Sequence, residues 1–196
     1  VIKTYSTMRN IILFGAPGAG KGTQSNIIRE KYNFAYISTG EILRAEIKNG
    51  TALGKQAEEV INKGQLVSDE IIVGMITSFI EKNNDKDLLL DGFPRTVAQA
   101  EALDKILEKM NRGEARVIEL EVPKSVLMQR LLKRAEIEGR KDDNEETINE
   151  RFNQYDAKTA KVAEYYKNKN AYIALDGEHG TPQEISVKLC ATIDKL

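Results

Sequence analysis

The sequence predicts an α/β fold, in which a five-stranded parallel sheet carries helices on both faces. Short apolar runs recur along the chain, and longer stretches with helical spacing of apolar residues separate them. Strands that are buried on both faces of a parallel sheet appear as continuous apolar runs, and the intervening helices supply the crossovers. A glycine-rich turn also follows the first apolar run, as a sharp connection from strand to helix requires.

The five expected strands are short and rich in Ile, Leu, Val and aromatic residues. Such residues favour extended backbone that is buried on both sides. The strands are expected at residues 11–14, 34–37, 88–90, 117–122 and 172–175.

The stretches between these strands carry apolar residues at the spacing of a helix. They cover residues 23–32, 68–82, 96–110, 124–135, 144–167 and 182–195. Ser68, Thr96 and Asn144 are expected N-caps, because a short side-chain oxygen can accept a hydrogen bond from a free backbone N–H. Cys190 falls in the apolar pattern of the last helix, and it is expected to be a buried bystander.

Two segments interrupt this alternation within one domain of residues 1–196. Residues 38–67 hold two short helical patterns, at 40–48 and 52–63, and are expected to form a helical insertion. Residues 135–144 form a polar loop that contains glycine. The core would then comprise residues 8–37, 68–134 and 145–196. Residues 1–7, before Met8, are expected to be a short extension or a cloning remnant.

Composition excludes several classes of protein. The chain has 196 residues, of which 41% are hydrophobic and 30% charged, as in ordinary globular proteins. No apolar run approaches the roughly 18 residues of a membrane span. A net charge of −1 argues against nucleic acid or a membrane surface as partner. A single cysteine excludes an internal disulfide and a multi-cysteine zinc site, which favours a reducing, cytoplasmic setting. His179, the only histidine, is expected in a loop and not as a catalytic base.

The segment GAPGAGKGT, residues 15–23, carries the pattern of a phosphate-binding loop. Gly15, Gly20 and Lys21 match it, and Thr23 comes one residue late because Gly22 follows the lysine. A turn of this kind can aim several backbone N–H groups inward, and the next helix adds the positive end of its dipole. The lysine can reach the terminal phosphates of a nucleotide.

The apolar run 88–90 ends in Asp91, which has the form of an aspartate that holds Mg²⁺ near a nucleotide. An aspartate at a strand end is also a common turn residue. Beside the phosphate-binding loop, Thr23 and Asp91 together predict a Mg²⁺ site, with Asp91 acting through water.

With its motif GxPGxGKGT, which includes Pro17 and Gly22, the sequence resembles the nucleoside monophosphate kinases, and most closely the adenylate kinase family with a short lid. Four further segments carry the resemblance over nearly all of residues 9–196: STGEILRAEI (38–47), GQLVSDE (64–70), DGFPRTVAQAE (91–101) and GRKDDNEETINERF (139–152). The resemblance implies a P-loop NTPase-type fold. Residues 38–67 would bind the nucleoside monophosphate and residues 135–144 would form the lid.

On the acceptor side, the resemblance implies that Arg44 and Arg95 hold the phosphate of AMP. The planar guanidinium suits two phosphate oxygens in a way that lysine does not. Gln99 offers an amide donor and acceptor, which could contact the edge of adenine, although a helical glutamine is more often solvated. Further AMP contacts are implied for Thr39, Gln65, Leu66, Val67, Gly92, Phe93, Pro94, Arg140 and Arg151.

On the donor side, the resemblance implies that Arg130 borders the ATP base and that Arg134 contacts its phosphates. Arg140 and Arg151 would approach the transferring group from the lid. Asp142 and Asp143 would hold the lid shut, or would simply cap the next helix. The ATP-binding set is Gly18, Ala19, Gly20, Lys21, Gly22, Thr23, Arg130, Arg134 and Gly180. The catalytic set is Lys21, Arg95, Arg134, Arg140 and Arg151.

The implied reaction is MgATP + AMP ⇌ 2 ADP in a monomer that binds ATP, AMP and ADP, with Mg²⁺ and without zinc. The nearest alternative is a UMP/CMP kinase, against which Thr39 and Gln99 favour AMP. A P-loop ATPase or nucleotide switch would leave Arg44 and Arg95 without a role. A non-catalytic nucleotide-binding protein would not need the charged positions that are present.

Overall fold

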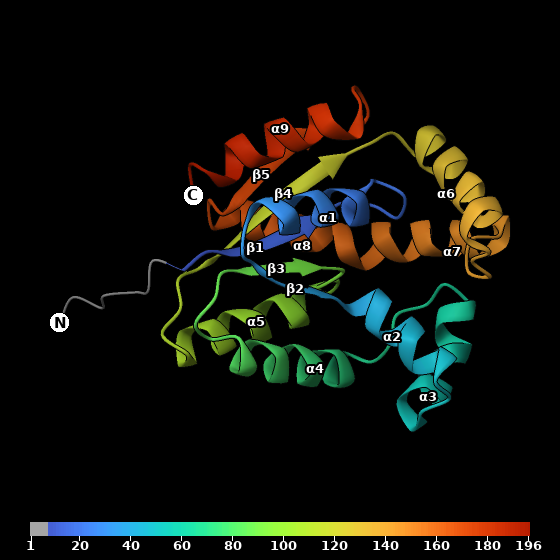
Figure 1. Cartoon of the computed structure of the whole chain (residues 1–196). Coiled ribbons are helices and arrows are strands. Elements are labelled where there is room, and N and C mark those ends of the chain that lie inside the picture. The colour runs from blue at the N-terminus through green and yellow to red at the C-terminus, as the bar shows by residue number, and fades with distance from the viewer. Residues whose placement is uncertain (1–7) are drawn as a thin grey trace.

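A parallel sheet of five strands forms the centre of the part of the chain that the computed structural model describes, residues 8–196. The expected extension at residues 1–7 lies outside the described residues. The strand order is β2-β3-β1-β4-β5, and all four ladders are parallel. The strands are β1 (Asn10–Phe14), β2 (Ala35–Ser38), β3 (Leu88–Asp91), β4 (Ala115–Glu121) and β5 (Tyr172–Asp176). The predicted fold class is confirmed (Figure 1).

Helices cover both faces of this sheet. They are α1 (Lys21–Lys31), α2 (Thr39–Lys48), α3 (Ala52–Asn62), α4 (Asp69–Lys82), α5 (Val97–Lys109), α6 (Lys124–Glu138), α7 (Glu145–Gln154), α8 (Ala160–Asn168) and α9 (Pro182–Ile193). A π-helical turn, η1 (Tyr155–Thr159), joins α7 to α8.

The alternation of side chains along β1 explains the two layers of core. Ile12 and Phe14 pack with buried residues of α4, α5 and α8 on one face. Ile11 and Leu13 pack with buried residues of α1, α6 and α9 on the other. Because successive side chains of a strand point to opposite faces, a run of four apolar residues serves both layers. Cys190 of α9 is buried, as expected.

Arg112 is buried at the amino end of the sheet, opposite the expected site. It is 2% exposed, and its guanidinium donates to Asn10 Oδ1 (2.8 Å), to the Asn84 carbonyl (2.9 Å) and to the Lys86 carbonyl (2.6 Å). Because a buried charge is costly unless it is hydrogen-bonded, these contacts tie β1 to the segment before β3.

The structure corrects three expectations about local structure. Helix α6 continues to Glu138, three residues beyond the expected end, and stops at Gly139, which has a φ of 64°. Part of the loop expected at 135–144 is therefore helical. The single helix expected at 144–167 is interrupted by η1. Ser68 makes no side-chain cap bond, whereas Thr96 and Asn144 accept from Gln99 N and Thr147 N.

The carboxyl ends of all five strands meet at one edge of the sheet, on the right in Figure 1. The phosphate-binding loop follows β1 there, and Asp91 ends β3. Helices α2 and α3 project below this edge, α6 lies above and to the right of it, and α7 lies to the right, level with β1 and β3. Residues 8–196 contain no helix with the length and apolarity that a membrane crossing would need.

Candidate active site

The turn between β1 and α1 is packed on one side and open on the other. Gly18 has a φ of 86°, and a Cβ at that position would lie 2.9 Å from Leu131 Cγ of α6. Gly20 has a φ of 94° and precedes α1, yet a Cβ there would meet no atom within 4 Å. The N-cap of α1 is Gly20, which has no side chain that could accept from the first N–H groups of the helix. A helix start of this kind favours an anion.

Lys21 lies across this turn. Its Nζ donates to the carbonyls of Gly15 (2.7 Å) and Ala16 (3.1 Å). Loss of water around the ammonium lowers the pKa of Lys21 to about 8. The carboxylate of Asp91 opposes this shift, and the positive charges of Arg95, Arg151 and Arg134 reinforce it.

Asp91 lies close enough to Lys21 to affect its pKa, and Thr23 follows Lys21 by two residues in α1. Asp91 is buried at the end of β3, and the Tyr36 hydroxyl donates to its Oδ2 over 3.4 Å. Thr23 is exposed in the first turn of α1. In the described residues, no group of three or more His, Cys, Asp or Glu side chains is gathered closely enough to hold a metal ion. The two side chains suit a hard cation that keeps most of its water, as Mg²⁺ does.

The turn after β3 joins the insertion to the arginine that follows it. The Gly92 carbonyl accepts from the Thr39 hydroxyl (3.0 Å) and from Arg95 Nε (2.9 Å). Burial lowers the pKa of Arg95 to about 10, the charges of Arg151 and Arg44 add to the shift, and Asp91 opposes it. Thr159 Oγ1, from the π-helical turn, donates to the Arg95 carbonyl (3.0 Å).

Gln99 is not solvated, since only 2% of it is exposed. Its Oε1 accepts from the Arg95 backbone N–H, and its Nε2 donates to Asp69 Oδ1, each over 2.7 Å. The alternative of a solvated helical glutamine is therefore wrong.

A cluster of charges joins α6, the segment that follows it and α7. Asp143 accepts from Arg134 Nε (2.6 Å), Arg134 Nη2 (2.8 Å) and Arg151 Nη1 (2.6 Å), and Asp142 lies 3.6 Å from Arg151 Nη1. Burial alone would raise the pKa of Asp143, but the arginines outweigh it and lower that pKa. Asp143 is thus an ion-pair partner, whereas Asn144 caps α7.

The remaining expected residues near α6 and in the loop after β5 lie outside this cluster of charges. Arg140 Nε donates to Glu138 Oε2 (2.5 Å) at the end of α6. Arg130 donates from both terminal nitrogens to the Gly177 carbonyl, over 3.1 and 3.2 Å. Gly180 is exposed before α9 with a φ of 114°. His179 is exposed beside Asp176 in the loop after β5, as expected.

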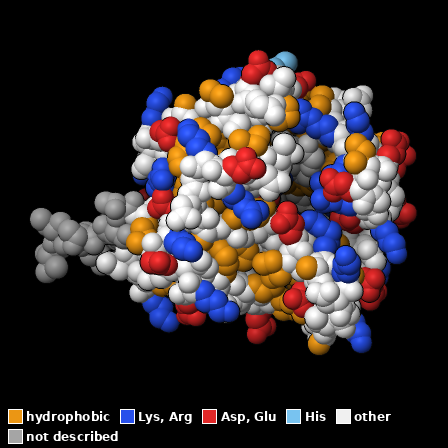
Figure 2. Space-filling model, in the orientation of Figure 1, with side chains coloured by type: hydrophobic (Ala, Val, Ile, Leu, Met, Phe, Trp, Pro, Cys, Tyr) orange, Lys and Arg blue, Asp and Glu red, His pale blue; other side chains and the backbone are white. Residues whose placement is uncertain are grey.

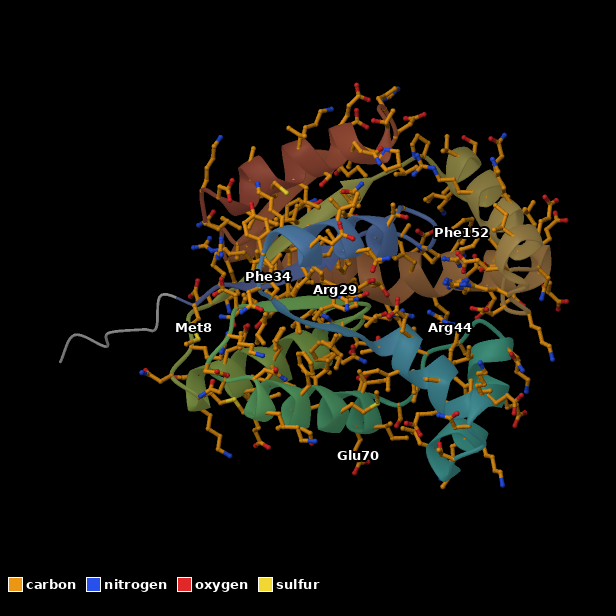
Figure 3. The ribbon with its side chains drawn as sticks, viewed as in Figure 1. Met8, Arg29, Phe34, Arg44, Glu70 and Phe152 are labelled. Atoms are coloured by element: carbon orange, nitrogen blue, oxygen red, sulfur yellow. The ribbon has the colours of Figure 1, made fainter. Side chains whose placement is uncertain are left out.

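Two adjoining hollows bring the two halves of the site together. One is lined by Gly15, Pro17 and Lys21, and the other by Thr39, Arg44 and Gln99. They share the lining residues Gly64, Leu66, Gly92, Arg95 and Arg151. Lys and Arg side chains gather around the hollowed surface on the right of Figure 2. Arg44 belongs to α2 of the insertion and lies on its side toward α7 in Figure 3. The site is one cleft that runs from the phosphate-binding loop to the insertion.

The cleft includes most of the expected acceptor residues and fewer of the donor residues. Gln65 and Val67 line the second hollow, and Phe93 and Pro94 line the first. Ten expected residues line neither hollow: Gly18, Ala19, Gly20, Gly22, Thr23, Asp91, Arg130, Arg134, Arg140 and Gly180.

Sequence reasoning missed several residues of the site and one that contacts it from outside both hollows. Tyr155 and Thr159 reach the cleft through a π-helical turn that no periodicity indicates. Asp69 lies within the segment GQLVSDE, but no role was expected for it, and its contact with Gln99 depends on the packing of α4 against α5.

Comparison with known proteins identifies a family. The family model described as Adenylate kinase matches residues 13–171. An adenylate kinase of Bacteroides thetaiotaomicron is 48% identical over 190 residues, which cover 96% of this chain and 100% of that protein. An adenylate kinase of Flavobacterium psychrophilum is 47% identical over 191 residues, with the same coverage. That of Azobacteroides pseudotrichonymphae is 47% identical over 190 residues, covering 96% of this chain and 99% of its own.

Proposed function

The chain belongs to the adenylate kinase family, and on that premise we propose that its cleft transfers the terminal phosphoryl group of ATP to AMP, giving two ADP. The single observation that carries this proposal is the pair of joined hollows. Arg95 and Arg151 line both of them, between the phosphate-binding loop and the insertion. An ATPase would need only the first hollow.

The donor occupies the open side of the phosphate-binding loop. Backbone N–H groups of residues 18–23 and the start of α1 receive its phosphates, and Lys21 turns from its own loop carbonyls to the terminal phosphate. Arg130 and the loop that ends at Gly180 border the adenine. The contact of Arg130 with the Gly177 carbonyl supports this assignment, because it brings the helix and the loop together.

The acceptor occupies the second hollow. Arg44 and Arg95 hold the AMP phosphate, and Gln99 meets the base. Apolar walls come from Leu43, Ile61 and Ile72, with Gln65, Leu66, Val67 and Thr39 completing the pocket. Phe93 and Pro94 continue the wall toward the donor.

Transfer requires position and charge more than acid–base chemistry. The reacting atoms must approach to about 3–3.5 Å in line, with water excluded. The phosphate of AMP is itself the nucleophile and is ionised near neutral pH, so no histidine base is needed. Lys21, Arg95 and Arg151 line the cleft, and Arg134 is held outside both hollows by Asp143. Together they stabilise the charge of the transition state. Arg140 joins them by leaving Glu138 when the lid closes.

Thr23 and Asp91 would hold Mg²⁺, with Asp91 acting through water. The buried carboxylate beside Lys21 supports this assignment, because the tyrosine hydroxyl at 3.4 Å satisfies little of its acceptor capacity. Mg²⁺ held by these two residues would supply positive charge that offsets part of the charge of the donor's phosphates. Zinc has no place in this mechanism, since the chain has one cysteine.

Residues 38–67 act as the AMP-binding insertion and residues 135–144 as the lid, and both close over the core when nucleotides bind. Adenylate kinase is itself a standard example of an enzyme whose lid closes over its substrates, so this motion is a property of the family. The enzyme works as a cytoplasmic monomer without nucleic acid or membrane as partner; the single cysteine and the net charge of −1 support this setting.

A coupled assay tests the function. With MgATP as donor, AMP is expected to be phosphorylated much faster than UMP or CMP, and ATP hydrolysis without an acceptor is expected to be slow. Faster turnover of UMP or CMP would favour the pyrimidine kinase instead. Rapid hydrolysis of ATP alone would favour an ATPase.

A further inference from the structure

The side-chain amide of Gln99 has a fixed partner at its oxygen and another at its nitrogen, and neither partner can switch between donating and accepting a hydrogen bond. The Arg95 backbone N–H can only donate, and it meets Oε1 over 2.7 Å. A carboxylate can only accept, and Asp69 Oδ1 meets Nε2 over 2.7 Å. Rotating the amide by half a turn would set N–H against N–H and oxygen against oxygen. These two partners therefore allow only one of the two possible orientations of the Gln99 amide.

Asp69 is itself held in place by a closed ring of contacts. Its Oδ2 accepts from the Thr96 hydroxyl (3.0 Å), and that hydroxyl accepts from the Gln99 backbone N–H (3.2 Å). Asp69 also lies in the first turn of α4, where the helix dipole favours a negative side chain. The ring thus links the start of α4 to the start of α5.

The oriented amide still has capacity for a ligand. Gln99 lines the acceptor hollow, and it retains one Nε2 hydrogen and one lone pair on Oε1. Adenine matches this pair, because its 6-amino group donates while a neighbouring ring nitrogen accepts. Hypoxanthine does not, because it has a carbonyl acceptor at position 6 and an N–H donor at N1.

We propose that Asp69 is a positioning residue that makes the acceptor site select 6-aminopurine over 6-oxopurine nucleotides, by holding the Gln99 amide in one orientation. The inference rests on the proposed function, in which the second hollow takes the nucleoside monophosphate. Asp69 acts only through Gln99 and lines neither hollow in the described structure.

The test compares AMP with IMP as acceptors in the wild type and in Asp69→Asn. Asparagine has nearly the same shape, but its amide can donate to Gln99 Oε1 or accept from Nε2. We expect the ratio of kcat/KM for AMP to that for IMP to fall about tenfold, the scale of one charge-assisted hydrogen bond. The change should appear in KM for the acceptor, with KM for MgATP within about twofold of the wild type.

Two further variants separate positioning from a general loss of structure. Glu70→Gln removes a negative charge from the same turn of α4, and Glu70 points away from the body of the molecule (Figure 3), so the ratio should not change. In a Gln99→Ala background, Asp69→Asn should leave the ratio unaltered, because Asp69 then has nothing to orient.

An unchanged ratio in Asp69→Asn would overturn the inference, as would an equal loss for AMP and IMP. A similar shift in the Gln99→Ala background would also do so. Calorimetric binding of AMP and IMP without ATP measures the same preference independently of turnover. If the wild type bound AMP over IMP but transferred no phosphate to it, the proposed function would fail while this inference stood.

Discussion

The binding of ATP is expected to take up a proton at alkaline pH, because the free enzyme holds Lys21 partly deprotonated. Burial lowers the pKa of Lys21 from 10.5 to about 8, and the nearby arginines strengthen this effect. The triphosphate would bring negative charge to the ammonium and raise its pKa toward the ordinary value. Binding should therefore be linked to protonation at pH values between these two pKa values.

The size of the effect follows from the two pKa values. At pH 9, about 10% of free Lys21 would be protonated, against nearly all of it beside bound phosphate, so uptake should approach about 0.9 proton per ATP. At pH 7 the lysine is already mostly charged, and uptake from it should be about 0.1 proton. The affinity for ATP should therefore fall as the pH rises through about 8, by roughly tenfold between pH 7 and pH 9.

Titration calorimetry of MgATP, without AMP, in two buffers of different ionisation enthalpy measures this uptake directly. Lys21→Met is the matched variant, since it keeps a long apolar stem and has no ammonium. Its proton uptake at pH 9 should be close to zero. Uptake near zero in the wild type, or equal uptake in both proteins, would refute the assignment of Lys21 to the phosphate.

Three further predictions concern single substitutions. Arg95→Ala should raise KM for AMP at least about tenfold, because it removes charge-assisted bonds to the acceptor phosphate, while the Kd of MgATP stays nearly constant; equal losses would contradict a separate acceptor site. Asp143→Asn should lower the free energy of unfolding, measured by urea titration, by about 2 kcal/mol, because Arg134 and Arg151 would lose their carboxylate partner while only 25% and 19% exposed. An unchanged urea midpoint would show that these ion pairs contribute nothing to stability. Arg112→Met should lower the free energy of unfolding by about 3 kcal/mol through its lost hydrogen bonds, yet leave kcat unchanged at temperatures below the thermal unfolding of the variant. A fall in kcat without a loss of stability would place Arg112 in the catalytic machinery.

The sequence determined the fold class and the chemical character of the site. The five apolar runs are too short and too continuous for surface helices, and GAPGAGKGT can serve few purposes other than binding phosphate. Both signals are local, since each depends on residues that are close in the chain. The N-caps at Thr96 and Asn144 were predictable for the same reason.

Only the tertiary structure decided how the separate pieces act on one another. Gln99 could have been a solvated helical residue, and its burial follows from the packing of α5 against α4, which brings Asp69 to it across 30 positions. The π-helical turn, which carries Thr159 to the Arg95 carbonyl, has no periodic signature in the sequence. Orientation of a side chain depends on partners from other elements, and those partners come together only when the chain is folded.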